Sequence, residues 1–366
     1  MSASWKYFGI RTLNMIVTIF IIALLISAFF TTLEEEDTEE AIRMQVQGEI
    51  KALNFENPED AYEYRETRIE ELKEENDLDS PRTERVLRNA LDMMVLDFGE
   101  TRRFAGRGAQ RTQILSIIME YLPYTILLFT TATIIYSLLA ILIGLKVAQN
   151  IGSKLDKFIT VLGATFSSVP VWWAGIIFVF VFYGILGWYP RPSPSFPSIH
   201  NVGYLGYIKE LLIKMSLPLF TIVLFKLGGR LYISRNIVSG ILEDDYIMAA
   251  RAKGIPENKV IYGHALKTAA PPIVTTAALA IITSLAGALI TEVIFSWPGI
   301  GFLLQSALYE ALPTEPSVAV FEDRLIAGIT FLLVIFSLVG LYIADIICAI
   351  LDPRVEIDSI FTEEVK

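Results

Sequence analysis

Cysteine and histidine are nearly missing from this chain. Cys348 is the only cysteine, so no disulfide can form within the chain. Histidine occurs only as His200 and His264, and neither an H-E-x-x-H motif nor a closely spaced cysteine pair is present. A metal-dependent or Ser-His enzyme needs its ligands or its base within hydrogen-bond reach of the reacting group. These absences predict a chain with no catalytic residue and no metal site.

A phosphate-binding loop of the Walker A type is also missing, because the chain nowhere places G, four residues and then G-K-[ST]. The chain therefore cannot bind ATP by that route. We expect no cofactor in it, and energy taken from ATP has to come from another subunit.

Apolar residues, in contrast, are abundant and make up 53% of the chain. About 20 consecutive apolar residues span a hydrocarbon core of roughly 30 Å. Six runs reach this length, at approximately 11–32, 122–147, 158–186, 211–233, 268–295 and 325–351. The first is longer than the apolar core of a typical signal peptide, so it counts as a span. The sequence therefore predicts an all-α integral membrane protein with six transmembrane helices.

The formal net charge of −10 is concentrated in one segment. Residues 34–79 contain 18 Asp and Glu against 5 Lys and Arg, whereas the rest of the chain is mildly basic. The run LEEEDTEEA (33–41) is typical of a solvated helix end, although a ligand-attracting or metal-binding surface would have the same composition.

The connections between the apolar runs divide by charge. Lys and Arg occur before the first run, between the second and third, between the fourth and fifth, and after the sixth. The acidic segment and residues 296–323, which contain no Lys or Arg, lie between the other runs. Because short loops rich in Lys and Arg stay in the cytoplasm, both termini are predicted to be cytoplasmic.

The segment 34–112, between the first and second runs, is therefore predicted to lie outside the cytoplasm. Asn57 is placed to cap a helix that starts at Pro58, and Ser80 and Pro81 repeat this arrangement. The second of these helices has an apolar stripe made of Leu87, Leu91 and Met94. We expect a small, acidic helical cap.

Ionisable residues at or near membrane depth are rare and indicate a transport pathway or an internal ion pair. They are Lys226, Arg230, Glu292 and Asp345. Lys226 is the deepest of them. Arg230 and Asp345 could instead extend to the cytoplasmic interface.

Two further features interrupt the apolar runs. Pro170, next to Ser167 and Ser168, frees a backbone carbonyl in the third run, which predicts a packed kink or a contact with substrate. The stretch Trp297-Pro298-Gly299 ends the fifth run, where it would form either a turn that narrows the outer mouth or an interface anchor. With Lys226 and Glu292, these residues are the pathway or gate candidates.

A polar segment, 235–267, lies between the fourth and fifth runs. Its pattern predicts a helix, a break at Gly254-Ile255-Pro256, and a second helix from Glu257 into the fifth run. The first helix would offer a face of small residues beside an aromatic, made of Tyr246, Ala249, Ala250 and Lys253. The alternative is an ordinary loop helix on the membrane surface.

The polar segment resembles the cytoplasmic EAA loop of permease subunits of ABC importers, with the pattern E-A-A, three residues, Gly, nine residues, I-x-L-P. Ala249, Ala250, Gly254 and Leu266 match this pattern, whereas Met248, His264 and Lys267 depart from it. The stretches DDYIMAARAKG and GHALKTA are similar to the variant found in the dipeptide/oligopeptide (Dpp/Opp) branch, in particular in its first permease subunit.

Further stretches resemble the same branch in order along nearly the whole chain. They are LDSPRTERVLRNALDMMVLDFGETR, YLPYTILL, SSVPVWWAGIIFVFVF, LGWYP, EVIFSWPGIG and DIICAILDPRV. The acidic run after the first span and the length of residues 309–323 depart from the branch, and both lie where a binding protein would dock.

The resemblance implies a function and a set of partners. The chain would be half of a heterodimer with a second, homologous permease, together with two ATPase subunits that bind ATP and Mg, an extracytoplasmic substrate-binding protein and the lipid bilayer, and without nucleic acid. The residues implied in coupling to the ATPase are Asp245, Tyr246, Ala249, Ala250, Arg251, Lys253 and Gly254. Di- and oligopeptides would cross the cell membrane by ATP-driven alternating access.

Two alternatives remain open from the sequence: the same type of importer carrying oligosaccharides or another small solute, and a stand-alone secondary transporter or channel. The latter should show ion-coupling charges and often an inverted repeat, and no repeat is visible. The predicted organisation is an N-terminus with the first span (1–33), the acidic segment (34–112), a core with spans two to six (113–352) and a cytoplasmic tail (353–366).

Overall fold

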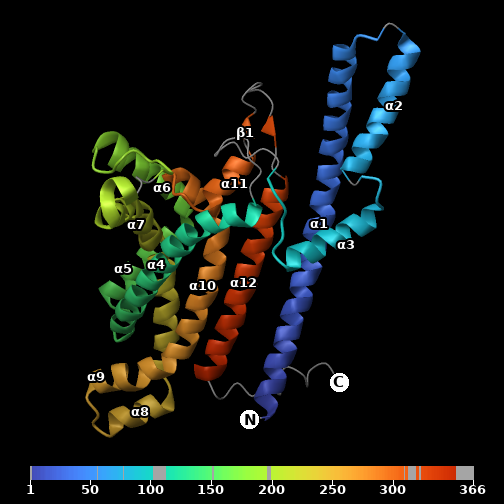
Figure 1. Cartoon of the computed structure of the whole chain (residues 1–366). Helices are drawn as coiled ribbons and strands as arrows, with labels where there is room; N and C mark the ends of the chain where they lie inside the picture. The colour runs from blue at the N-terminus through green and yellow to red at the C-terminus, as the bar shows by residue number, and fades with distance from the viewer. Residues whose placement is uncertain are drawn as a thin grey trace. The chain divides into compact units, whose positions relative to one another are not determined.

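The computed structural model of the chain describes residues 2–55, 57–76, 78–101, 113–150, 152–195, 199–308, 310–311, 319–320 and 323–351. The described residues are almost entirely helical (Figure 1). They form two compact units. The core unit contains Met119–Ser306 and the second half of the last helix, and the hairpin unit contains Ile10–Ile118 and Ala307–Ile335. The predicted tail 353–366 lies outside the described residues.

The core unit is built from apolar helices joined by short breaks. Its elements are α4 (Ile114–Ala148), α5 (Lys154–Ser168), α6 (Val171–Val179), a π-helical turn (Phe180–Ile185), α7 (Ile199–Leu242), α8 (Asp245–Ala252), α9 (Glu257–Lys259), a second π-helical turn (Val260–Ala265), α10 (Leu266–Phe295) and α11 (Ile300–Leu308). Within α7, Gly203 has a φ of 69°, so the continuous helix begins after it.

Close backbone contact between α5 and α7 organises the core unit. A Cβ atom added to Gly163 would lie 2.8 Å from the carbonyl oxygen of Gly228, which only glycine tolerates. Small residues of this kind let helices approach in a membrane, where packing rather than hydrophobicity drives association. At the start of α5, the Asp156 carboxylate accepts two hydrogen bonds from the Arg235 guanidinium on α7, at 2.9 and 3.0 Å. The two helices are therefore fixed at two points.

The third apolar run, predicted as one span with a packed kink, is broken much more sharply. α5 and the helix formed by α6 and its π-helical turn meet at an angle of 87°. Val169 between them is extended because proline disfavours helical backbone in the residue before it. Pro170 then starts α6 without needing an N–H partner. The predicted break at Pro170 is therefore confirmed, but the angle between the two helices is much larger than that of a kink within one span.

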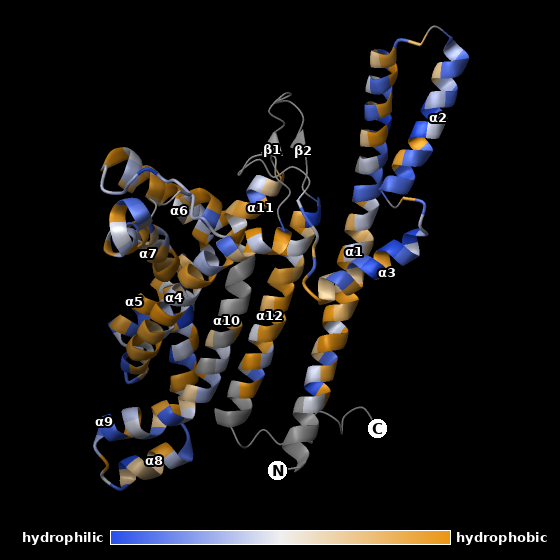
Figure 2. Ribbon diagram, viewed as in Figure 1, coloured by the Kyte–Doolittle hydropathy of each residue, from blue (hydrophilic) through white to orange (hydrophobic). Residues whose placement is uncertain are grey.

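The hairpin unit begins with a single helix that is longer than predicted. Its elements are α1 (Ser2–Leu53), α2 (Pro58–Glu75), α3 (Arg82–Met94), the strands β1 (Glu310–Ala311) and β2 (Ala319–Val320), and the first half of α12 (Asp323–Leu351). α1 has 52 residues and continues through the acidic run without a break. At 1.5 Å per residue it is about 78 Å long, more than twice the hydrocarbon thickness. Figure 2 shows the apolar part of α1 giving way to a largely polar part.

The acidic run is therefore not a helix end, as predicted, but the middle of α1, and several of its carboxylates are paired. A carboxylate oxygen of Glu34 lies 2.7 Å from a guanidinium nitrogen of Arg324. A carboxylate oxygen of Glu35 lies 2.9 Å from a guanidinium nitrogen of Arg85. Glu39 accepts a hydrogen bond from Lys73 of α2 at 3.1 Å. Basic residues distant in sequence offset part of the charge, which no local pattern could reveal.

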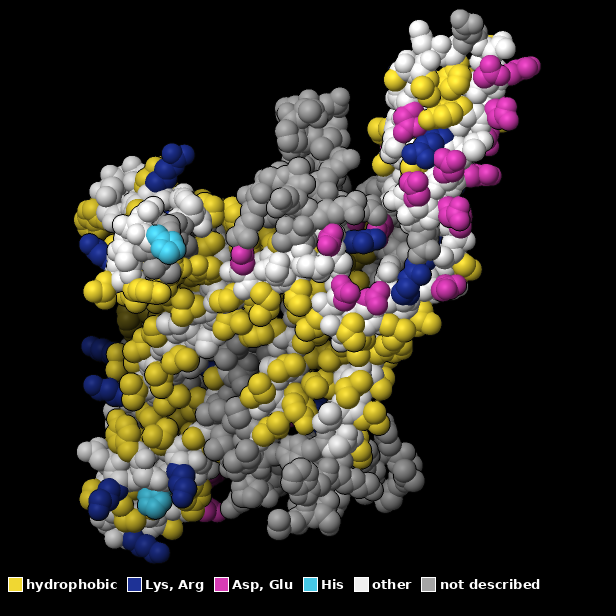
Figure 3. Space-filling view, viewed as in Figure 1, with side chains coloured by type: hydrophobic (Ala, Val, Ile, Leu, Met, Phe, Trp, Pro, Cys, Tyr) yellow, Lys and Arg dark blue, Asp and Glu magenta, His cyan; other side chains and the backbone are white. Residues whose placement is uncertain are grey.

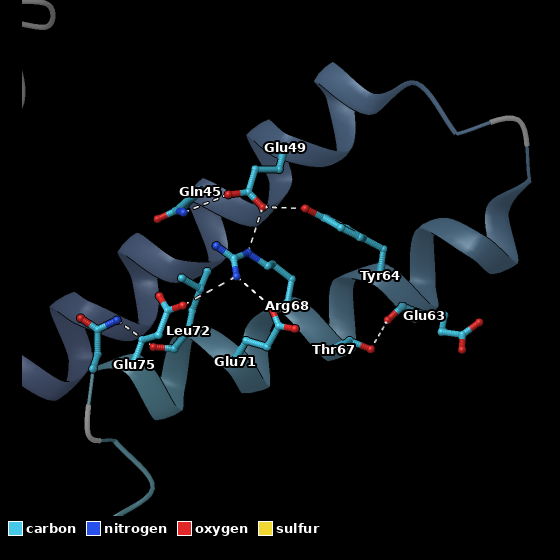
Figure 4. A network of polar contacts seen from close by, with 10 residues as sticks. Gln45, Glu49, Glu63, Tyr64, Thr67, Arg68, Glu71, Leu72 and Glu75 are labelled. Atoms are coloured by element: carbon cyan, nitrogen blue, oxygen red, sulfur yellow. Dashed lines mark hydrogen bonds and ion pairs between the residues drawn. The ribbon is translucent and has the colours of Figure 1, made fainter.

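Beyond the acidic run, α1 and α2 form a helical hairpin with a small apolar seam of Ile42, Val46 and Leu72. Figure 4 shows the polar network beside it, in which the Glu49 carboxylate accepts a hydrogen bond from the Tyr64 hydroxyl at 3.0 Å and faces Arg68 at 3.4 Å. The bond to Glu49 raises the pKa of Tyr64, because ionisation would place two negative charges together. Acidic side chains cover much of this hairpin (Figure 3).

α3 differs from its prediction in start and in orientation. It begins at Arg82 with Pro81 in the capping position, one residue later than expected. Its buried residues are Arg85, Ala90 and Met93. Leu87 and Leu91 of the predicted stripe are exposed, whereas Ala90 is fully buried, so α3 packs through a different face from the one predicted.

Four helices are long and apolar enough to cross a membrane, or up to six when each bent pair counts as one span, among the described residues. They belong to α1, α4, α7 and α12, and the bent pairs include the one at Pro170. α10 covers the fifth predicted run. The short strands β1 and β2 depart from an all-α description, because they form an antiparallel ladder of two residues each.

Candidate functional site

The polar segment has the predicted shape of helix, glycine, proline and helix. α8 ends at Ala252, and Gly254 has a φ of 75°, the left-handed conformation that terminates helices. The Ile255 N–H then returns to the Ala250 carbonyl at 3.3 Å. Pro256 stands in the capping position of α9, immediately before the first turn in which it was expected. In Figure 1, α8 and α9 project from the ends of α7 and α10.

The two faces of α8 are different from those predicted. Ile247 and Ala250 point inward, with Ala250 only 7% exposed. They pack in a cluster that also contains Leu145, Val238, Leu242, Val260, Ile261 and Ala265. Asp245, Tyr246, Ala249, Arg251 and Lys253 are exposed, as is Met248. Ala250 therefore does not share an exposed face with Tyr246 and Ala249: it anchors the segment.

Polar contacts hold the segment as one body. The Arg251 guanidinium donates to both carboxylate oxygens of Glu257, at 3.2 and 2.7 Å, across the Gly254 turn. These bonds lower the pKa of the Glu257 carboxyl, although an ion pair this exposed contributes little stability. The Tyr246 hydroxyl donates to the Thr268 Oγ1 atom of α10 at 2.9 Å. The segment is thus tied directly to α10, and several Lys and Arg side chains lie on the face of this part that Figure 3 shows.

The break between α5 and α6 opens a cavity of about 410 Å³, which we call the broken-helix cavity. Four predicted pathway residues line it together: Ser167, Ser168, Pro170 and Lys226. Each serine hydroxyl donates to a carbonyl of the preceding turn of α5, to Gly163 at 2.7 Å and to Ala164 at 2.9 Å. Lys226 is exposed. Both serines and Pro170 therefore belong to a cavity wall as well as to the kink.

Arg230 also lines this cavity, one helical turn from Lys226 on α7. Its side chain is buried, with only 5% of the residue exposed. The guanidinium donates to the Ile273 carbonyl of α10 at 2.8 Å, and its Nε atom has no partner among the described residues. Hydropathy marks Arg230 as a charge at membrane depth, but the residue is not among the predicted pathway residues. The i,i+4 spacing to Lys226 was the signal that could have placed it there.

The remaining candidates form a second site at the α10–α11 break. Ser296 adopts a left-handed conformation, and Trp297, 2% exposed, packs against Leu128, Phe129, Met215 and Ile222. The Trp297 Nε1 donates to the Tyr124 carbonyl at 3.0 Å. An interface anchor would face lipid, so that interpretation is wrong.

Glu292 completes this turn rather than the broken-helix cavity. Its carboxylate is fully buried, and one oxygen accepts a hydrogen bond from the Gly301 N–H at 2.6 Å. A Cβ added to Gly299 would lie 2.2 Å from the other oxygen, so a side chain at this position would displace the carboxylate. Pro298 is buried in the same turn. Glu292, Trp297, Pro298 and Gly299 are thus brought together as a fixed turn.

Replacing Trp297 with phenylalanine is expected to lower the free energy of unfolding by about 1–2 kcal/mol, through loss of one hydrogen bond and of packed volume. The midpoint of thermal unfolding in detergent should fall by about 4 °C. Trp188→Phe is the matched control, because Trp188 is 75% exposed, and it should leave the midpoint unchanged. Equal effects of the two replacements would contradict the packed role of Trp297.

Comparison with known proteins agrees with these features. Residues 140–357 match the family described as "Binding-protein-dependent transport system inner membrane component". The chain is 31% identical over 287 residues to the oligopeptide transport system permease protein AppB of Bacillus subtilis (strain 168), covering 78% of this chain and 84% of the relative. It is 28% identical over 262 residues to the dipeptide transport system permease protein DppB of Alkalihalophilus pseudofirmus, covering 66% and 74%. The di/tripeptide transport system permease protein DppB of Pseudomonas aeruginosa is 28% identical over 250 residues, covering 64% and 70%.

Proposed function

The chain belongs to the family of binding-protein-dependent transport system inner membrane components, and we propose that it is the permease subunit of an importer that carries di- and oligopeptides. It is a multi-pass protein of the cell membrane. The observation that carries the proposal is the α8 segment, a rigid polar body on the end of apolar helices in a chain of this family. The peptide substrate rests on the relatives, which are named for oligopeptide, dipeptide and tripeptide transport.

In the proposed topology the chain crosses the membrane six times, with α5 and α6 as one broken crossing. Both termini and the α8 segment are cytoplasmic, and the α1–α2 hairpin with α3 is an extracytoplasmic cap. The support is the distribution of charge: the α8 segment has Arg251, Lys253 and Lys259, whereas residues 34–79 are strongly acidic. The exposed Leu87 and Leu91 of α3 suit a helix lying at the membrane surface.

The proposed mechanism is alternating access driven by ATPase subunits. The exposed face of α8 docks into an ATPase groove, and Ile247 and Ala250 transmit the motion of the ATPase into the core unit. Coupling of this kind requires a physical link between two states, and the link here consists of the Tyr246 bond to α10 and the apolar cluster under α8. The broken-helix cavity lies in the same unit and is the proposed pathway wall. A second, homologous permease supplies the opposite wall, and a binding protein delivers the substrate from outside.

Uptake is expected to need every partner. Proteoliposomes that contain this chain, the second permease and both ATPase subunits should import a dipeptide only when ATP is inside and the binding protein is outside. The purified chain alone should show neither ATP hydrolysis nor uptake, because it has no phosphate-binding loop. ATP-independent uptake by the lone chain would instead support a stand-alone transporter. Uptake of an oligosaccharide with no uptake of peptide would show that the proposed peptide substrate is wrong.

A further inference from the structure

The broken-helix cavity is positively charged. Its lining residues include the cations Lys226 and Arg230 and the hydroxyl groups of Ser167 and Ser168, and no Asp or Glu is among the described lining residues. A charge at membrane depth is costly, so two cations four residues apart on one helix need a reason. Hydrogen bonds within the protein do not fully explain either cation. Arg230 uses one guanidinium nitrogen for the Ile273 carbonyl, and the Lys226 side chain is exposed.

Two further observations indicate that the cavity attracts an anionic group. The Nε atom of Arg230 is buried and has no partner among the described residues, although a buried donor normally finds one. α6 begins at Val171, which lines the same cavity, and no side chain among the described residues caps its N-terminus. The N-terminus of a helix carries partial positive charge and unpaired N–H groups, which favour a carboxylate or phosphate nearby.

We propose that the broken-helix cavity binds the C-terminal carboxylate of a peptide in transit. This inference rests on the proposed function, which supplies the substrate class. Peptides of different sequence share few chemical groups, and the terminal carboxylate is one that every unmodified peptide carries. A fixed cationic site can therefore accept many peptides without reading their side chains. Lys226, exposed and flexible, makes the first contact, and the buried Arg230 keeps the field positive.

The test compares uptake of trialanine with uptake of trialanine amide in proteoliposomes that contain the complete importer. The amide lacks the carboxylate and has no other charged side chain. The wild type should import trialanine faster. In Lys226→Gln the ratio of the two rates should fall about fivefold, as expected for loss of one contact of modest strength. Lys226→Arg should restore the ratio, because it keeps the positive charge.

One control variant and one further test variant separate carboxylate binding in the cavity from a general loss of transport. The same binding protein is used throughout, so its own preference for a free C-terminus cancels when variants are compared. Lys209→Gln removes a lysine from the same helix outside the cavity lining, and it should leave the ratio unchanged. Ser168→Asp adds a carboxylate to an exposed position of the lining. Because this negative charge would repel the peptide carboxylate, the ratio of trialanine uptake to trialanine amide uptake should fall below the wild-type ratio. That variant decides the matter if Lys226→Gln does not assemble.

The failure of this inference and the failure of the proposed function look different. If Lys226→Gln and Ser168→Asp import both peptides with the wild-type ratio, the cavity does not bind the carboxylate, and the proposed importer function stands. If the complete wild-type importer takes up neither peptide, the substrate class is wrong, and the inference fails with it.

Discussion

Replacement of Gly228 with leucine is expected to prevent the core unit from folding. A Cβ atom at this position would lie 2.9 Å from the Cα atom and 3.0 Å from the carbonyl oxygen of Gly163, and 3.2 Å from the Cβ atom of Phe166. Backbone atoms cannot give way as a flexible side chain can, so α5 and α7 would have to separate. We expect a loss of about 3 kcal/mol or more, at the upper end of overpacking effects.

Gly240→Leu provides the matched control for this replacement. Gly240 lies on the same helix, and no described atom comes within 4 Å of an added Cβ. Leucine raises helix propensity at both positions, so propensity cannot explain a difference between them. The measurement is the yield of monodisperse protein after extraction in detergent, followed by thermal unfolding. Gly228→Leu protein as stable as Gly240→Leu protein would show that the α5–α7 contact is looser than described.

Replacement of Ala249 with glutamate is expected to lower peptide uptake strongly while the chain stays folded. Ala249 is exposed on α8, in the face proposed to enter the ATPase groove, so a longer, charged side chain should block docking without disturbing the apolar cluster below. Loss of a docking interface should lower uptake at least tenfold, which corresponds to about 1.4 kcal/mol or more. Uptake into proteoliposomes and co-purification of the ATPase with the permease are the two measurements.

The neighbouring alanine distinguishes docking from folding. Ala250→Glu would bury an unpaired carboxylate in the apolar cluster, so it should lower the unfolding temperature of the chain by itself. Ala249→Glu should leave that temperature unchanged, and Ala249→Ser should leave uptake near wild type. Normal uptake and normal ATPase co-purification by Ala249→Glu would mean that this face of α8 is only a surface loop.

Ala249 and Ala250 also show which features of α8 the local sequence pattern can predict and which it cannot. Tyr246, Ala249, Ala250 and Lys253 fall on one broad face by spacing, and the sequence has no signal for which part of that face turns inward. The answer depends on Leu145, Val238 and Ile261, which come from other helices. The turn itself was predictable, because Gly254 and Pro256 express their backbone preferences locally.

The polar residues at depth illustrate the same division. Hydropathy identified Lys226, Arg230 and Glu292 as unusual, since the cost of a charge in lipid does not depend on its neighbours. Their separation into two sites followed from tertiary contacts: Lys226 and Arg230 line the broken-helix cavity, whereas Glu292 accepts the Gly301 N–H in a different turn. Trp297 was placed correctly near the end of a helix, but its packing against Leu128 and Met215 decided its role.

The sequence by itself determined the class of protein, the six apolar runs, the break at Pro170 and the shape of the α8 segment, because each follows from chain length, hydropathy or the backbone preferences of Gly and Pro. The family resemblance in the same residues pointed to an importer permease. Tertiary structure alone decided the right angle at Pro170, the single long helix α1 with its paired acids, and which residues share a cavity. Those features depend on contacts between residues far apart in the chain, and the local sequence pattern of either residue does not predict such a contact.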